Sequence, residues 1–108
     1  MGTYLLVETR DPFDSVDADH FCELATGLAD EHHDVVFFLT QNAVLGTRRG
    51  ASKAPKLGQL ATKATVLADD FSLRERAIST DDLVDGIYVA GVDRLVDLAV
   101  SGRKVIWH

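Results

Sequence analysis

The segment Ala64-Thr65-Val66-Leu67-Ala68-Asp69-Asp70 decides the fold that this sequence predicts. Its apolar residues are consecutive, which is typical of a short strand buried on both faces of a parallel sheet. The strand then ends abruptly in two carboxylates. Because ligands of open parallel sheets bind beyond the carboxyl ends of the strands, Asp69 and Asp70 mark the first place to look for a site.

Four other apolar runs predict the neighbouring strands of this sheet. They cover residues 3–7, 35–39, 87–90 and 104–107. The strongest of them is Val35-Val36-Phe37-Phe38-Leu39, which is rich in β-branched and aromatic residues and is apolar on both faces.

Helical periodicity fills the segments between these strands. The first helix is expected from Ala18 to about Glu31, after a cap at Ser15 or Asp17. Its apolar stripe consists of Phe21, Leu24, Ala25 and Leu28. Further helices are expected over residues 43–50, 52–61, 71–78 and 92–100. This alternation predicts a three-layer α/β/α sandwich with a mostly parallel five-stranded sheet, in a single domain over residues 1–108.

Length and charge exclude several classes of function. A chain of 108 residues with no run of eighteen apolar residues has no expected membrane span. Its formal net charge of -6 argues against nucleic acid as a partner, because phosphate binding needs a basic face. The single cysteine, Cys22, cannot form an internal disulfide, and a cytoplasmic location is the simplest expectation.

Two segments carry a resemblance to a known family. The first is Val35–Leu39 followed by Asn42-Ala43-Val44-Leu45. The second is Gly86-Ile87-Tyr88-Val89-Ala90-Gly91-Val92, which precedes a Leu/Ala-rich helix and the strand Lys104-Val105-Ile106-Trp107. With its length and order of elements, the chain resembles the DsrE/TusD-like (DsrEFH-like) sulfur-relay proteins.

The resemblance implies a DsrE-like fold that assembles into trimers or hexamers. In active members a cysteine near the end of the middle strand carries a persulfide sulfur to a partner protein. Ala68 stands at the matching position here, and His32 stands where the family usually has glycine. The resemblance therefore implies a non-catalytic subunit without a cofactor, which serves as a scaffold or binds a partner, such as a sulfur-relay protein, in sulfur handling.

Cys22 supports an alternative function as a relocated sulfur carrier. A carrier thiol must be exposed and needs a lowered pKa. Cys22 lies on the apolar side of its predicted helix, and free cysteines are among the most buried residues, so core packing is the favoured interpretation.

A second alternative is a small-molecule or anion site at the carboxyl ends of the strands. Its expected ligand-binding residues are Arg10, Asn42, Ala68, Asp69 and Asp70. The competing interpretation of the two aspartates is that one of them caps the helix over residues 71–78. Adjacent side chains also point apart, which disfavours a shared ligand.

Four cations cluster between residues 48 and 56 in this acidic chain. Arg48, Arg49, Lys53 and Lys56 predict either a contact for a protein partner or an anion, or an ordinary solvated face. No metal site is expected from His20, His32, His33 and His108, because none of them forms an i, i+4 pair. Trp107 is expected either to line a pocket or subunit contact, or to be buried against the last helix.

Overall fold

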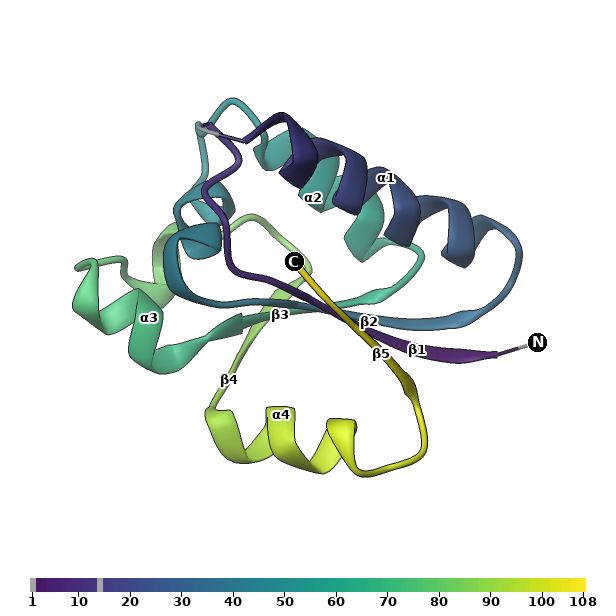
Figure 1. Ribbon diagram of the computed structural model, residues 1–108. Helices are drawn as coiled ribbons and strands as arrows, with labels where there is room; N and C mark the ends of the chain where they lie inside the picture. Colours follow the sequence, from purple (N-terminus) through teal and green to yellow (C-terminus); the bar gives the residue numbers. More distant parts are fainter. Residues whose placement is uncertain (1, 14) are drawn as a thin grey trace.

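The computed structural model describes residues 2–13 and 15–108. Within them, five strands form one all-parallel sheet in the order β4-β3-β2-β1-β5 (Figure 1). The strands are β1 (Thr3–Glu8), β2 (Asp34–Leu39), β3 (Thr65–Asp69), β4 (Ile87–Ala90) and β5 (Lys104–Trp107). The predicted α/β fold with a five-stranded parallel sheet is confirmed. The central strand, however, is β2, with β3 second from the edge.

The predicted helical segments are present with shifted ends, and one short 3-10 turn was not predicted. The helical segments are α1 (Val16–Asp30), the 3-10 segment η1 (Gln41–Thr47), α2 (Ala54–Ala61), α3 (Asp70–Glu75), the 3-10 turn η2 (Thr80–Asp82) and α4 (Val92–Ala99). Ser15 is the cap of α1, since its hydroxyl accepts a hydrogen bond from the Ala18 amide at 3.2 Å.

One face of the sheet is closed by α1 and α2, which lie side by side above it (Figure 1). Phe21, Ala25 and Leu60 of these helices pack in one cluster with Phe37 and Val66 of the sheet. The predicted stripe of α1 is wrong at Leu24, which is 44% exposed. The helix is turned so that its row of small residues is buried, namely Ala18, Cys22, Ala25 and Ala29.

The opposite face is covered by α4 alone (Figure 1). Leu95 and Leu98 of α4 pack against the strand residues of this face, which are Leu5, Val7, Val36, Phe38 and Leu67. Parallel pairing places Trp107 beside Val7, so the indole lies on this face. It is 60% exposed, and the interpretation that it is buried against the last helix is wrong.

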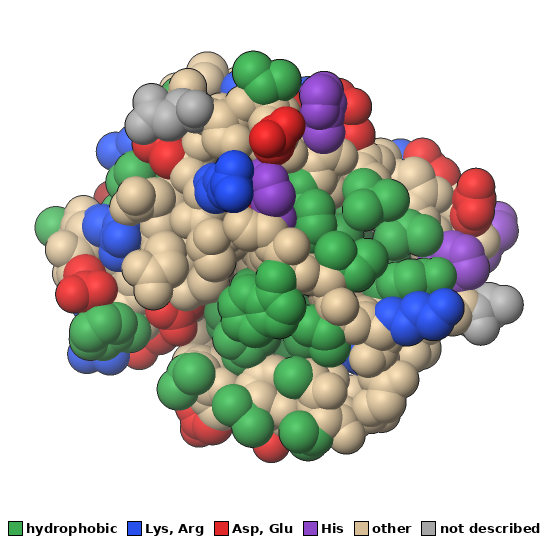
Figure 2. Space-filling model, in the orientation of Figure 1, with side chains coloured by type: hydrophobic (Ala, Val, Ile, Leu, Met, Phe, Trp, Pro, Cys, Tyr) green, Lys and Arg blue, Asp and Glu red, His purple; other side chains and the backbone are tan. Residues whose placement is uncertain are grey.

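Hydrophobic side chains consequently remain at the surface of the α4 face. Figure 2 shows them gathered in the middle of the molecule and along α4 below it. The exposed large apolar residues of α4 and of the strand positions on this face are Tyr88, Val92, Val96, Val100, Val105 and Trp107. The sheet therefore has one closed face and one that is only partly covered.

Candidate functional site at the carboxyl edge of the sheet

The end of β3 is organised by one buried carboxylate. Asp69 is 7% exposed, and its Oδ2 accepts hydrogen bonds from the Ser72 amide at 3.0 Å and the Ser72 hydroxyl at 2.6 Å. Thr40, which directly follows β2, donates to the same oxygen at 3.4 Å. Asp69 is thus the cap of α3 and ties the exits of β2 and β3 together.

The neighbouring polar groups are also paired within the chain. The Gln41 amide donates to Ser72 Oγ at 2.9 Å, and Gln41 has a φ of 55°, in the left-handed region that is uncommon outside glycine. Asp70 lies 3.3 Å from Arg74 in an i, i+4 ion pair. Asn42 accepts two hydrogen bonds from the Arg76 guanidinium, at 3.2 Å and 2.9 Å.

A groove of ≈ 510 Å³ lies between these groups and the start of α4. Its lining is polar at the strand exits and apolar at Phe38, Phe71 and Leu95. Of the five predicted ligand-binding residues, the structure brings Asp69 and Asp70 to this groove. Ala68 is 0% exposed within the core on the α1/α2 side, so its side chain cannot contact a ligand there. Arg10 lines a different cavity.

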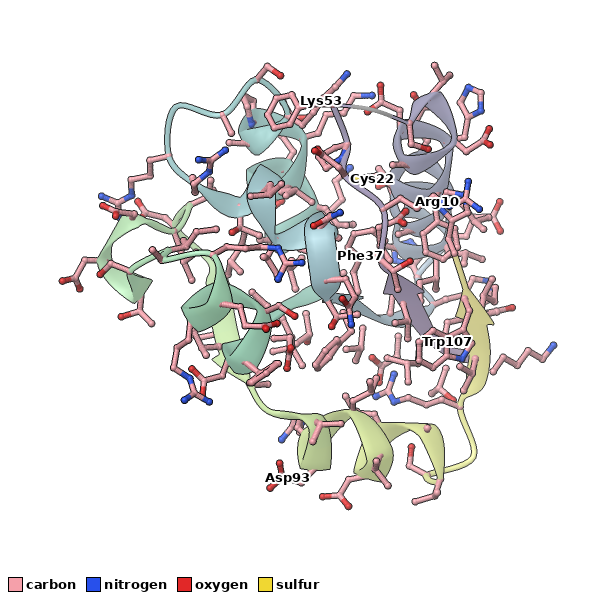
Figure 3. All side chains as sticks on the ribbon, turned by 60° about the vertical axis from the view of Figure 1, so that its left-hand side comes forward. Arg10, Cys22, Phe37, Lys53, Asp93 and Trp107 are labelled. Atoms are coloured by element: carbon pink, nitrogen blue, oxygen red, sulfur yellow. The ribbon has the colours of Figure 1, made fainter. Side chains whose placement is uncertain are left out.

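Cys22 lies beside that second cavity, between α1 and α2 over β2. In Figure 3 it stands between Lys53 and Phe37, which line the same cavity. The cavity has ≈ 20 Å³ of free volume, room for about one water molecule. Cys22 is 8% exposed, and burial raises the pKa of its thiol from 9.0 to about 11. The thiolate that a sulfur carrier needs is therefore scarce at neutral pH.

The predicted cation patch is largely neutralised by contacts within the chain. Lys53 lies 2.8 Å from Asp19 of α1, and Lys56 lies 3.3 Å from Glu23 and 3.6 Å from Asp19. The hydrogen bond from Lys53 lowers the pKa of Asp19. Arg49 lies 2.6 Å from Asp85, while the exposed Arg48 donates to the Leu45 carbonyl at 3.1 Å. Lys53 and Lys56 thus fasten α2 to α1.

A buried pair at the exits of β1 and β5 was not anticipated from the sequence. Glu8 is 2% exposed, and its carboxylate oxygens lie 3.0 Å and 2.8 Å from His108 Nδ1. The Arg10 amide donates to Glu8 Oε1 at 2.9 Å, and the His108 ring lies 5.1 Å from the Phe21 ring. One signal was available: Glu8 is a carboxylate directly after the buried run Leu5–Val7, where an unpaired charge would be costly.

His33 has a structural role, whereas His20 and His32 are exposed. The Gly2 amide donates to Nδ1 of His33 at 2.8 Å, and the His33 ring packs edge-on against Tyr4. Among residues 2–13 and 15–108, no group of three or more His, Cys, Asp or Glu side chains is placed to hold a metal ion. In the same part of the chain, no helix combines the length and apolarity that crossing a bilayer requires.

Comparison with known proteins identifies relatives of the fold only. No protein-family model matches the chain, and no curated protein matches its sequence. Among solved structures, the ychN protein from E. coli is similar over 100% of both chains, with a TM-score of 0.90 and 23% identity. MTH1491 from Methanobacterium thermoautotrophicum has a TM-score of 0.78 and 20% identity over 98% of this chain and 97% of its own.

A third structure, BT1422 from Bacteroides thetaiotaomicron, has a TM-score of 0.82 and 14% identity, covering 98% of this chain and 94% of its own. MTH1491 and BT1422 are both described as proteins of unknown function. At these identities the likeness establishes a shared α/β architecture. The likeness assigns no site residue in this chain.

Proposed function

We propose that this protein is a non-catalytic, DsrE-like subunit that assembles with copies of itself and serves as a cytoplasmic scaffold or partner-binding protein in sulfur handling. Two observations support the absence of thiol chemistry. Ala68 stands at the end of β3 without a thiol, and Cys22 is buried with a raised pKa. Both observations disfavour sulfur transfer and favour a binding function.

The observation that carries the proposal is an exposed valine stripe along α4 and its C-cap residue, Val100. Val92, Val96 and Val100 recur at intervals of four residues and are 66%, 53% and 77% exposed. The inward residues Leu95 and Leu98 already attach the helix to the sheet. A second apolar row on a helix that is already docked is typical of a surface that another protein covers.

Charged residues beside the stripe are free for contacts with that other protein. Within residues 2–13 and 15–108, no salt bridge uses Asp93, Arg94 or Asp97 of α4. All three side chains are exposed. Unpaired charges that flank an apolar centre are the usual rim of a protein interface.

We assign the stripe to a second copy of this chain. Residues spaced by four form ridges that interdigitate when two identical helices cross, so the stripe is complementary to itself. Arg94 of one copy can then pair with Asp93 or Asp97 of the other, because both charge signs lie along one helix. Such a two-fold contact joins two trimers into a hexamer.

Light scattering after size exclusion tests this assignment at micromolar concentration. The wild type is expected at six times the chain mass, and Val96→Asp is expected to lower that mass to three times the chain mass. Val16→Asp is the matched control, because Val16 is 73% exposed at the start of α1, which covers the opposite face. It should assemble as the wild type does.

Two results would contradict the proposal. One is a wild type that stays strictly monomeric at micromolar concentration. The other is a Val96→Asp variant with the wild-type mass. Far-UV circular dichroism on each variant separates loss of assembly from loss of folding.

A further inference from the structure

We infer that the exits of β1 and β5 form a binding site for a small oxyanion, a carboxylate or a phosphate group, held by Arg10 and His108. This site goes beyond the proposed assembly, and all of its residues come from one chain. Three features support the site: the sheet topology, the buried Glu8–His108 pair and the Arg10 side chain beside it.

The sheet topology favours this position over the end of β3. Strands β1 to β4 follow one another in one direction across the sheet, whereas β5 returns to the far side of β1. The strand order therefore reverses between β1 and β5. In open parallel sheets the ligand crevice lies beyond the carboxyl ends of the strands at such a reversal.

The Glu8–His108 pair orients the imidazole at this point. An ionised carboxylate only accepts hydrogen bonds, so His108 Nδ1 carries the proton that lies between them. Nε2 is then the nitrogen that remains for a ligand. Thr9 fixes the backbone of His108, because the Thr9 hydroxyl donates to the His108 carbonyl at 3.0 Å.

Burial of Glu8 calls for positive charge beside it. A carboxylate that is 2% exposed is costly without compensation, and His108 is the only side chain that forms a salt bridge with Glu8 among the described residues. In its charged form the imidazole donates from both nitrogens. Nε2–H can then donate to an anion while Nδ1–H stays on Glu8.

Arg10 supplies the second positive group. Its amide lies on the same carboxylate as the His108 ring, and its side chain is exposed. No salt bridge within residues 2–13 and 15–108 uses the Arg10 guanidinium. Figure 3 shows Arg10 just beyond the carboxyl end of β5, above Trp107. A guanidinium binds the oxygens of carboxylates and phosphates in pairs.

Arg10 is the cation left for an anion at the cavity between α1 and α2. Lys53 and Lys56 also line it, but they are paired with Asp19 and Glu23, whereas no salt bridge among the described residues uses Arg10. The chain as a whole has a net charge of -6. Since the cavity has only ≈ 20 Å³, the anion would bind over its rim at the loop surface.

Isothermal titration calorimetry with inorganic phosphate and with acetate tests the site on the full chain. Sodium chloride at equal ionic strength is the blank. Saturable binding of either probe is expected. The affinity for the probe should fall by about tenfold or more in Arg10→Gln and in His108→Gln, because each substitution removes a charge-assisted hydrogen bond. Which probe binds more tightly distinguishes a carboxylate ligand from a phosphate ligand.

Arg48→Gln is the matched control, because Arg48 is an exposed arginine elsewhere on the surface and should leave the affinity unchanged. Trp107 is the single tryptophan and precedes His108, so its fluorescence should change on binding. The inference is overturned if neither probe binds above the chloride blank. It is equally overturned if Arg10→Gln, which removes an exposed side chain, binds as the wild type does.

Discussion

The two faces of the sheet differ in how completely helices cover them. The α1/α2 face buries a continuous core that includes Phe37, Leu57 and Leu60. Salt bridges also join α1 to residues that flank α2, from Lys53 to Asp19 and from Lys63 to Asp30 at 2.7 Å. The α4 face has a smaller cluster of buried residues, and no salt bridge among the described residues reaches α4.

The apolar residues of the two faces should therefore have different roles, one in folding and the other in association. Residues of the closed face are buried on folding and contribute to the free energy of unfolding. The valines of α4 remain exposed in the single chain, and burying them in an assembly would contribute to association. Substitutions on the first face should therefore change stability, and substitutions on the second should change the assembled mass.

Phe37→Ala should have the largest effect on stability. Phe37 is 1% exposed at the centre of the closed face, where its ring lies 5.9 Å from that of Phe21. Truncation removes a buried aromatic side chain and leaves a cavity, so the free energy of unfolding should fall by about 3–5 kcal/mol. Urea denaturation followed by circular dichroism measures the change.

Val96→Ala is the comparison on the other face. It removes a half-exposed side chain from a helix and should change the unfolding free energy of the single chain by less than about 0.5 kcal/mol. The measurement belongs at a concentration below that of assembly, since association would add its own stabilisation. Similar losses in both variants would mean that the two faces are equally buried.

Asp69→Ala should have the next largest effect, at the edge where the two faces meet. The substitution removes the acceptor for Ser72 and Thr40, and with it the cap of α3. A loss of about 2–3 kcal/mol is expected for a buried, multiply bonded cap. Thermal or urea unfolding measures it.

Asp70→Ala provides the control for Asp69→Ala. Asp70 is partly exposed, and its one salt bridge within the described residues is the i, i+4 pair with Arg74, so the expected loss is about 0.3–0.5 kcal/mol. If the two alanine variants lost equal stability, the β3 exit would not be organised by the Asp69 network.

Much of the fold could be predicted because its signals are local. Each strand is a run of apolar residues, and Ser15 and Asp69 are ordinary helix caps. The lateral order of the strands could not be read in this way, because β5 pairs with β1 across the whole length of the chain. The same pairing decides which face carries Trp107, and so which face is open.

The candidate site was harder to predict for the same reason. Glu8 and His108 are 100 residues apart, and only the return of β5 brings them together. The sequence predicts a site at Asp69 and Asp70 because these two residues directly follow the apolar run of a strand. The left-handed backbone of Gln41 also lies outside what residue type suggests, because it follows from the contact of its amide with Ser72.

Cys22 on the closed face should make the stability of the protein depend on pH. Burial raises the pKa of this thiol from 9.0 to about 11, so the folded state favours the protonated form. That contribution is complete below pH 9 and is lost as the pH rises toward 11. Between pH 7 and pH 10, the free energy of unfolding of the wild type should fall by about 1.4 kcal/mol more than that of Cys22→Ala.

Urea denaturation of both proteins at pH 7 and pH 10 isolates this difference, since all other titrating groups are shared. Alkylation by iodoacetamide at pH 8 gives an independent measure. It should be about 100-fold slower in the native protein than in urea, because thiolate is that much scarcer. Rapid native alkylation, or stable sulfur addition from a persulfide donor at Cys22, would instead support the sulfur-carrier alternative.

Lys53→Gln should have a smaller effect than the Phe37, Asp69 and Cys22 variants, and it tests the salt bridges that distinguish the closed face. Lys53 and Asp19 are both partly exposed, and the hydrogen bond between them lowers the pKa of Asp19 from 3.8. Stability from this pair is therefore present above pH 3.8 and is lost as the pH falls through the lowered pKa. The variant should lose about 0.5–1 kcal/mol at pH 7 in low salt and less than that at pH 2.5, where protonation of Asp19 weakens the pair. Arg48→Gln, without a carboxylate partner among the described residues, should match the wild type at both pH values. A loss in Lys53→Gln that persists unchanged at pH 2.5 would assign the role of Lys53 to packing of its aliphatic stem between α1 and α2, not to its charge.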